Sequence, residues 1–423
     1  MNLRIPFGGF IKNNLLYSSV SYAFRLFLNI VIFVLLARYF NVSNFGIISL
    51  FIIIINLISV SSDLGFRLLI VRELSVRRDL LDGQYILDKF WLKLLSLFIV
   101  SSIVIAYSYA NDFWGYNIVL VISLIVSGFF LNLSNTLFSV FQSFNKYYLE
   151  ASSLFVMIVL LSFTLVISRR PDGIALFFYG YSVSMVITFF TAFYFLNAKV
   201  KKLRFSNWKI PSFKAVKKEI LIILPFTGII ILEALNFSFD SFFVEQYCSA
   251  ESLGEYSALI RLVSGLTIFS TILASACMPA LSRITADGVI KSKVKLFTIY
   301  GVIVLSGLFI FLVYYLLNDH LIKLLLGDKY LFLLEWDKYI FFIAISDYLR
   351  VLPGIFLVTF NREKIRLYLV LGFLIYGAIS FYVFLPGNES DTAASTMVTI
   401  RIVTTVVMVA YFFYLVFFDS KKK

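Results

Sequence analysis

Four polar side chains share one face of the first strongly apolar segment of this 423-residue chain, and one of them is a permanent cation. They are Ser18, Tyr22, Arg25 and Asn29, which recur at spacings of four, three and four residues. Side chains three or four residues apart lie together on a helix. An arginine at the centre of a membrane helix costs about 2.5–3.5 kcal/mol on insertion scales. This face must therefore look into protein or water, and not into lipid.

Other apolar segments carry polar residues at the same spacing, and together they predict a polar seam with charges of both signs. They are Glu233, Asn236 and Asp240 in one segment, Arg261 in the next, and Asn132, Asn135, Ser139 and Gln142 in an earlier one. Arg25 could hold an anion in this seam. It could instead pair with Glu233 or Asp240 as a structural bridge, or extend its head group to a helix end.

The composition indicates that these polar residues lie on membrane-spanning helices. Hydrophobic residues make up 61% of the chain and the mean hydropathy is +0.93, whereas a soluble domain is about 45–50% apolar. A spanning helix needs about 20 mostly apolar residues. Twelve segments qualify: 15–37, 45–62, 90–110, 117–140, 152–168, 174–197, 219–243, 253–276, 296–317, 339–360, 367–385 and 395–418. We therefore predict an all-α integral membrane protein.

The basic residues predict the orientation of these helices. With the N-terminus in the cytoplasm, 27 of the 37 Lys and Arg residues fall in cytoplasmic segments and 5 fall in outer loops. This asymmetry follows the positive-inside rule and predicts that both termini are cytoplasmic. It also accounts for the net charge of +13, so a nucleic-acid partner is not expected.

Other charged residues in or beside the segments have simpler interpretations. Asp63 is predicted to cap a turn at a cytoplasmic helix end, and Asp347 and Arg350 are predicted to form a local ion pair because they are three residues apart. A basic cluster is predicted to set the topology or to meet anionic lipid head groups. Its members are Arg67, Arg72, Arg77 and Arg78.

A short internal repeat predicts two halves. The fragment ARYFNVSNFGIIS can be laid over EQYCSAESLGEYS with a constant offset of 208 residues, which pairs Gly46 with Gly254. Both fragments lie in the predicted outer turn after the first helix of their half. We therefore predict two parallel six-helix bundles, the arrangement in which transporters move two halves about a central site. They are residues 1–198 and 219–423, joined by a basic cytoplasmic linker at 199–218.

The run LLARYFNVSNFGIISLFIIIINLISVSSDLGFRLLIVREL resembles the N-terminal signature of polysaccharide-lipid flippases. The matching residues are Leu36, Ala37, Arg38, Phe45, Gly46, Asp63, Leu64, Gly65, Arg72 and Glu73. The later fragments LPF, LGEYSALIRLVSG and MPALSR are also similar to that family. The chain thus resembles, along its whole length, the Wzx-type O-antigen flippases of the MATE-like MOP exporter superfamily.

This resemblance implies a flippase that moves a polyprenyl-pyrophosphate-linked oligosaccharide to the outer leaflet by ion-coupled alternating access. Arg25, Asn29 and Arg261 are then candidates for substrate binding, because the fixed charge and forked donors of arginine suit phosphate. Glu233 and Asp240 are candidates for coupling to a proton or a sodium ion. The implied partners are an undecaprenyl-pyrophosphate-linked oligosaccharide, membrane lipids and other polysaccharide-assembly membrane proteins, in the bacterial cytoplasmic (inner) membrane.

Two other functions are weighed against this one. A MATE-type cation-coupled drug exporter would use the same architecture, although its cavity should be net acidic. A polysaccharide polymerase or ligase is the enzymatic alternative, but relatives of that kind carry a large catalytic outer loop. The sequence has no Walker motif, and its single histidine and two cysteines have no metal-ligand spacing. We therefore predict that the protein is not an enzyme and uses no metal or cofactor.

Overall fold

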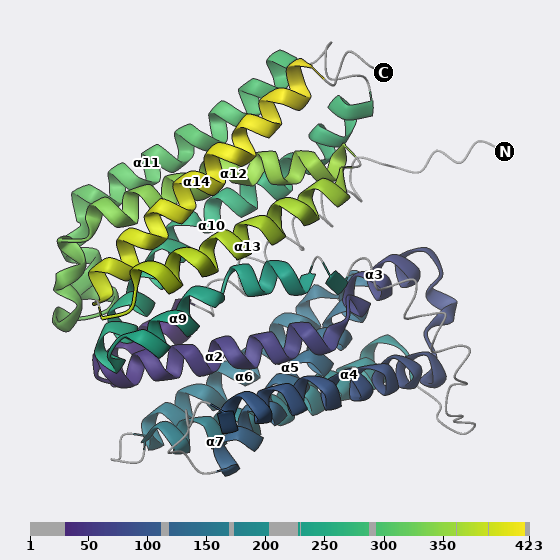
Figure 1. Ribbon diagram of the computed structural model, residues 1–423. Coiled ribbons are helices and arrows are strands. Elements are labelled where there is room, and N and C mark those ends of the chain that lie inside the picture. Colours follow the sequence, from purple (N-terminus) through teal and green to yellow (C-terminus); the bar gives the residue numbers. More distant parts are fainter. Residues whose placement is uncertain are drawn as a thin grey trace. The chain divides into compact units, whose positions relative to one another are not determined.

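The computed structural model describes residues 30–110, 118–168, 173–202, 227–228, 230–286, 293–360, 362–387 and 389–418. Within these ranges the regular elements are helices (Figure 1). Ten of these helices are long and apolar enough to cross a membrane, and a shorter apolar helix, Ile30–Tyr39, precedes them. The predicted all-α membrane class is therefore confirmed. Residues 15–29 of the first predicted span lie outside the described residues.

The contacts divide the chain into two compact units. The first unit is Met1–Leu35 with Phe51–Ala234, and the second is Leu36–Leu50 with Leu235–Lys423. Most of the predicted linker, residues 203–218, lies outside the described residues.

The first unit is built mainly from α2 to α7. The elements are α2 (Val42–Asp63), whose first nine residues belong to the second unit, α3 (Phe66–Val76), α4 (Gly83–Ala110), α5 (Ile118–Ser143), α6 (Tyr147–Ile167) and α7 (Gly173–Phe195), with short turns η1 (Arg78–Leu80) and η2 (Leu196–Val200). Helix α7 packs against α5 and α6, and α3 packs against α5. Gly128 of α5 lies directly against Ile58 of α2, where a Cβ atom would be only 2.7 Å from the isoleucine side chain. This close approach joins α2 to α5.

The second unit is built mainly from α9 to α14. The elements are α9 (Phe239–Tyr247), α10 (Ala250–Ala286), α11 (Lys293–Leu325), η4 (Asp328–Leu334), α12 (Asp337–Thr359), α13 (Glu363–Phe384) and α14 (Ser390–Phe417). Helix α12 packs against α10, α11 and α14. Its buried side chains, which include Leu352 and Phe356, meet Phe412 of α14 in the apolar core. The connection between α11 and α12 is short, because α11 continues to Leu325 and η4 follows.

The repeated fragments have the same local structure. Helix Ile30–Tyr39 is followed by two non-helical residues and then by α2, and α9 is followed after the same number of residues by α10. The two repeat-equivalent glycines also contact each other: a Cβ atom on Gly46 would lie 2.5 Å from the backbone nitrogen of Gly254. Both glycines belong to the second unit. The spacing that revealed the repeat thus also marks a backbone-to-backbone contact between its two copies.

We expect Gly254→Val to destabilise the protein, because overpacking a tight contact costs about 1–3 kcal/mol. Gly265→Val is a matched control on the same helix, since a Cβ atom there would meet nothing within 4 Å. The measurement is the midpoint of thermal unfolding of the purified protein in detergent. Equal midpoints for the two variants would show that the glycine contact is not needed for stability.

Two basic side chains reinforce this part of the second unit by capping helix ends. The Arg38 guanidinium donates to the carbonyl oxygens of Lys323, at 3.3 Å, and of Leu324, in the last turn of α11. The Lys329 ammonium donates to the carbonyl of Phe40, just after helix Ile30–Tyr39. The last carbonyls of a helix lack partners within it and carry partial negative charge. These two cations therefore fix segment Leu36–Leu50 to its neighbours.

The predicted span at 219–243 is not one continuous helix in its described part. Residues 230–236 are helical, Phe237 and Ser238 form a turn, and α9 begins at Phe239. The backbone N–H of Ser238 donates to the carbonyl of Leu235 at 2.9 Å. The predicted helical spacing from Asn236 to Asp240 therefore does not hold, because this turn lies between them. Asp240 lies instead in the first turn of α9.

Candidate functional site

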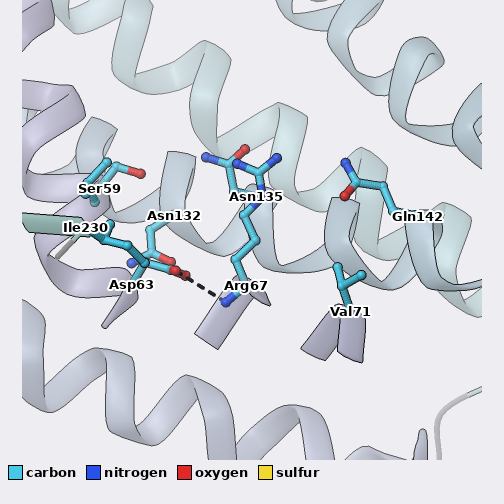
Figure 2. Close-up of a pocket in the computed structure, with 9 residues that line it drawn as sticks. Ser59, Asp63, Arg67, Val71, Asn132, Asn135, Gln142 and Ile230 are labelled. Carbon is cyan, nitrogen blue, oxygen red and sulfur yellow. Dashed lines mark hydrogen bonds between the residues drawn. The ribbon is translucent and has the colours of Figure 1, made fainter. Parts of the chain in front are cut away.

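A cavity of about 550 Å³ in the first unit gathers polar side chains from three helices (Figure 2). It is lined by Ser59, Val60 and Asp63 of α2, Arg67 and Val71 of α3, Asn132, Asn135 and Gln142 of α5, and Ile230. This volume lies within the range of small-molecule sites. Since α2 and α5 are apolar enough to span a membrane, a polar cavity beside them marks a candidate functional site.

The turn between α2 and α3 places Asp63 and Arg67 on the cavity. Leu64 and Gly65 both have positive φ angles, of 52° and 83°, and the glycine adopts this left-handed conformation without strain. The Asp63 carboxylate then accepts the backbone N–H of Arg67 at 3.3 Å, as Figure 2 shows. The prediction that Asp63 caps a turn is thus confirmed. The cap also aims the chain so that both side chains line the cavity.

Lys93 of α4 lies behind this wall and is completely buried. Its ammonium donates to Asp63 Oδ1 at 2.6 Å, to Asn132 Oδ1 at 2.7 Å and to the hydroxyl of Thr136. An ammonium has three donors, so these bonds satisfy it fully. Lys93 therefore neutralises Asp63 and fixes the position of Asn132, and it has no donor left for a ligand.

The count of cytoplasmic basic residues includes Lys89 and Lys93 in a predicted loop at 63–93, whereas the structure buries both lysines in α4. The predicted loop at 63–93 contains α3 and the first residues of α4. Lys89 is also buried, and its ammonium lies 5.2 Å from the ring centres of both Phe66 and Tyr85. The signal that could have identified these lysines is their four-residue spacing in the segment KFWLKLL, which begins at Lys89 and is otherwise apolar.

The predicted polar face of α5 is confirmed for three of its four members. Asn132, Asn135 and Gln142 line the cavity, whereas the buried Ser139 hydroxyl donates to the carbonyl of Asn135 at 2.9 Å. Behind the wall, Gln142 Nε2 donates to the buried carboxylate of Glu150 at 2.9 Å. Amides can both donate and accept. The lining therefore suits a ligand that carries hydroxyl groups together with an anion.

The second unit holds a separate group of buried charges. Asp347 Oδ1 accepts a hydrogen bond from Arg350 at 2.7 Å and one from Arg401 at 3.4 Å. The predicted pair of Asp347 and Arg350 is thus confirmed, and Arg401 of α14 extends it. Asp240 is also buried in this unit, and its carboxylate accepts the Tyr256 hydroxyl at 2.6 Å.

The other predicted site residues are distributed over both units. Arg25 and Asn29 lie outside the described residues. Glu233 is half-buried in the helical segment 230–236 and belongs to the first unit, whereas Asp240 and the half-buried Arg261 belong to the second. These three described residues are not part of the cavity lining in the first unit. Arg67 and Lys93 were missed as site residues, because basic residues at a cytoplasmic helix end are ordinarily explained by topology.

Comparisons with known proteins give a family and a fold. The sequence model of a family described as polysaccharide biosynthesis protein matches residues 11–285. No curated protein matches the chain. An inward-facing structure of a multidrug resistance MATE family transporter of the MOP superfamily is 12% identical, with a TM-score of 0.74 over 94% of this chain and 95% of that one.

Two further structures are similar. One is a MOP superfamily transporter from Pyrococcus furiosus, which is described as having a binding pocket of reverse polarity that suggests a different function. It is 13% identical, with a TM-score of 0.62 over 96% of this chain and 95% of that one. A eukaryotic MATE transporter is also 13% identical, with a TM-score of 0.62 over 97% of both chains. At such identities the likeness establishes the fold and not the substrate. The fold is that of the MATE-like transporters.

Proposed function

The chain belongs to the polysaccharide biosynthesis protein family, and we propose that it is a flippase for a polyprenyl-pyrophosphate-linked oligosaccharide. It carries an O-antigen unit or a similar glycan repeat from the cytoplasmic to the outer leaflet by ion-coupled alternating access. The protein is a multi-pass membrane protein. Within the proposal it lies in the bacterial cytoplasmic membrane with both termini inside.

The cavity of the first unit is the observation that supports this substrate. A lipid-linked oligosaccharide combines a pyrophosphate, which needs cationic or N–H donors, with sugars, which need groups that donate and accept. The guanidinium of Arg67 and the amides of Asn132, Asn135 and Gln142 line one cavity. Because Lys93 holds Asp63, the cavity carboxylate is already paired. An anionic head group with hydroxyls therefore fits this lining chemically.

The residues singled out by spacing keep roles within this proposal. Arg25, Asn29 and Arg261 contribute further substrate contacts, and Glu233 and Asp240 are the candidate carboxylates for a coupling proton or sodium ion. Asp240 is the more buried of the two carboxylates, since only 1% of its surface is exposed whereas Glu233 is half-buried. The proposed partners are the undecaprenyl-pyrophosphate-linked substrate, membrane lipids and other membrane proteins of polysaccharide assembly.

The test is complementation in the native host after deletion of the gene. We expect the wild-type protein to restore surface glycan and to clear the lipid-linked precursor that accumulates on the cytoplasmic side. Arg25→Ala should abolish this restoration and Arg25→Lys should rescue it in part, because lysine keeps the charge but not the forked donors. All variants are compared at equal abundance in the membrane.

Three outcomes separate the alternatives. If the wild type restores no glycan while precursor synthesis is normal, the flippase proposal fails, and efflux of cationic drugs becomes the next assay. If the wild type and Arg25→Ala restore glycan equally, the flippase proposal stands and Arg25 has only a structural role. If the wild type lengthens glycan chains from a precursor that is already on the outer leaflet, the protein is a polymerase.

A further inference from the structure

Phe237 occupies an unusual position in the second unit. It lies in the turn that separates the helical residues 230–236 from α9, and 63% of its surface is exposed. Helices interrupted within the membrane are a common way to build binding sites in transporters, because the interruption frees backbone groups and redirects side chains. The turn therefore presents an aromatic ring at a place where a continuous helix would have passed.

Two guanidinium groups lie over this ring. The Cζ atoms of Arg350 and Arg401 are 6.0 Å and 5.9 Å from its centre, and both arginines bind the carboxylate of Asp347. The side chains of Arg350 and Asp347 remain 17% and 19% exposed. The open surface beside the ring is thus bordered by charged groups from α12 and α14.

This setting excludes lipid as the neighbour of the ring. Exposed rings on the outer surfaces of spanning helices need no explanation, because lipid covers them. Charged side chains that remain partly exposed inside a membrane protein face protein or a water-filled space. Since Phe237 shares its surroundings with Arg350, Asp347 and Arg401, its open side faces such a space.

We propose that Phe237, Arg350 and Arg401 form a sugar-binding subsite for the oligosaccharide. The inference rests on the proposed flippase function and adds a second contact region to it, in the second unit. The flat apolar face of a sugar ring packs on an aromatic ring, while its hydroxyl groups need donors and acceptors at the edge. A guanidinium has five N–H donors, and Asp347 occupies one from each arginine, so further N–H groups serve hydroxyl oxygens.

One unsatisfied polar atom at this subsite supports the same inference. Arg401 is more than nine-tenths buried, yet its Nε has no hydrogen-bond partner. A buried donor without a partner is destabilising, so such a group in a native structure needs an explanation. A rotation of the side chain would bring this N–H group to a sugar hydroxyl, which supplies the missing acceptor.

The experiment compares two lipids that differ only in the glycan. The probes are the lipid-linked oligosaccharide extracted from the native host and undecaprenyl pyrophosphate without sugar, each titrated against purified protein and followed by native mass spectrometry. We expect Phe237→Leu to weaken binding of the oligosaccharide about fivefold to tenfold, from the loss of a stacked ring. Binding of the sugar-free lipid should not change. Phe237→Tyr should bind both probes as the wild type does.

The control is Phe309→Leu, which changes a ring of α11 that is 66% exposed. This variant should bind both probes normally. The subsite is refuted if Phe237→Leu binds the oligosaccharide as tightly as the wild type does, or if it loses affinity for both lipids equally. If the wild type binds neither probe, the flippase proposal fails and the subsite fails with it. A wild type that binds both lipids equally well also refutes the subsite, because the sugar then contributes nothing.

Discussion

Lys93→Met is expected to destabilise the protein by about 3–5 kcal/mol, the range measured when one partner of a buried ion pair is removed. Methionine fills much of the same volume, so the loss arises from charge and not from a cavity. Asp63 would keep its negative charge in an apolar bundle without the ammonium at 2.6 Å. Asn132 and Thr136 would lose a donor at the same time.

A double substitution separates this explanation from simple loss of packing. In Lys93→Met with Asp63→Asn, both charges are absent, and we expect most of the stability to return. The asparagine still accepts the backbone N–H of Arg67, so the cap of α3 survives. The measurement is unfolding by sodium dodecyl sulfate in mixed micelles, followed by circular dichroism and analysed as a double-mutant cycle.

The matched control is Lys199→Met, which removes an exposed lysine from the same unit. Its unfolding midpoint should equal that of the wild type. If Lys93→Met is as stable as this control, then Asp63 binds another partner or a proton with no loss of stability, and the prediction is wrong. If the double variant is as unstable as Lys93→Met, the defect lies in packing and the interpretation of the buried pair is wrong.

The hydrophobic pattern predicted the fold because the membrane imposes a simple rule on helices. Long apolar segments such as α2 and α14 were located to within a few residues, since spanning helices must satisfy their own backbone groups. The same pattern could not reveal that 230–236 and α9 are separate helices. Phe237 and Ser238 lie in an apolar stretch without glycine or proline, so the turn depends on tertiary contacts that a sequence does not display.

The candidate site was predictable only where polar residues interrupt an apolar helix. Asn132, Asn135 and Gln142 were found in this way, and the structure places them on the cavity. Arg67 and Lys93 were not, because cations at a cytoplasmic helix end have an ordinary explanation in topology. What distinguishes Lys93 is its partner Asp63, thirty residues earlier in the chain, and such pairing follows from the packing of α2 against α4 and α5.

The two groups of buried charges suggest different roles for the two units within the proposed function. In the first unit, Lys93 has all its donors occupied and holds the wall of the cavity in place. In the second unit, Asp347 accepts from two arginines and leaves Arg401 Nε without a partner. A fully satisfied network stiffens a scaffold, whereas a partly satisfied one is suited to bind and release. This contrast makes the second unit the better location for contacts that change during transport.

Arg67→Gln is expected to reduce restoration of surface glycan by about tenfold or more, because a charge-assisted hydrogen bond contributes about 1.5–3 kcal/mol. Glutamine keeps the backbone N–H that Asp63 accepts, so the α2–α3 turn should be preserved. Arg67→Lys should have an intermediate effect, since it keeps the charge but loses the forked geometry. The measurements are surface glycan and lipid-linked precursor in the complemented host, at equal membrane abundance.

Arg77→Gln is the control that makes the Arg67 result interpretable. Arg77 belongs to the same basic cluster and is exposed at the end of α3, so this variant removes the same topological charge without touching the cavity. If both variants export glycan equally well, Arg67 serves topology and not the substrate. If both fail equally, loss of the positive-inside signal explains the defect. The proposal that the substrate anion binds in this cavity is supported only if Arg67→Gln fails, Arg77→Gln does not, and the precursor stays on the cytoplasmic side.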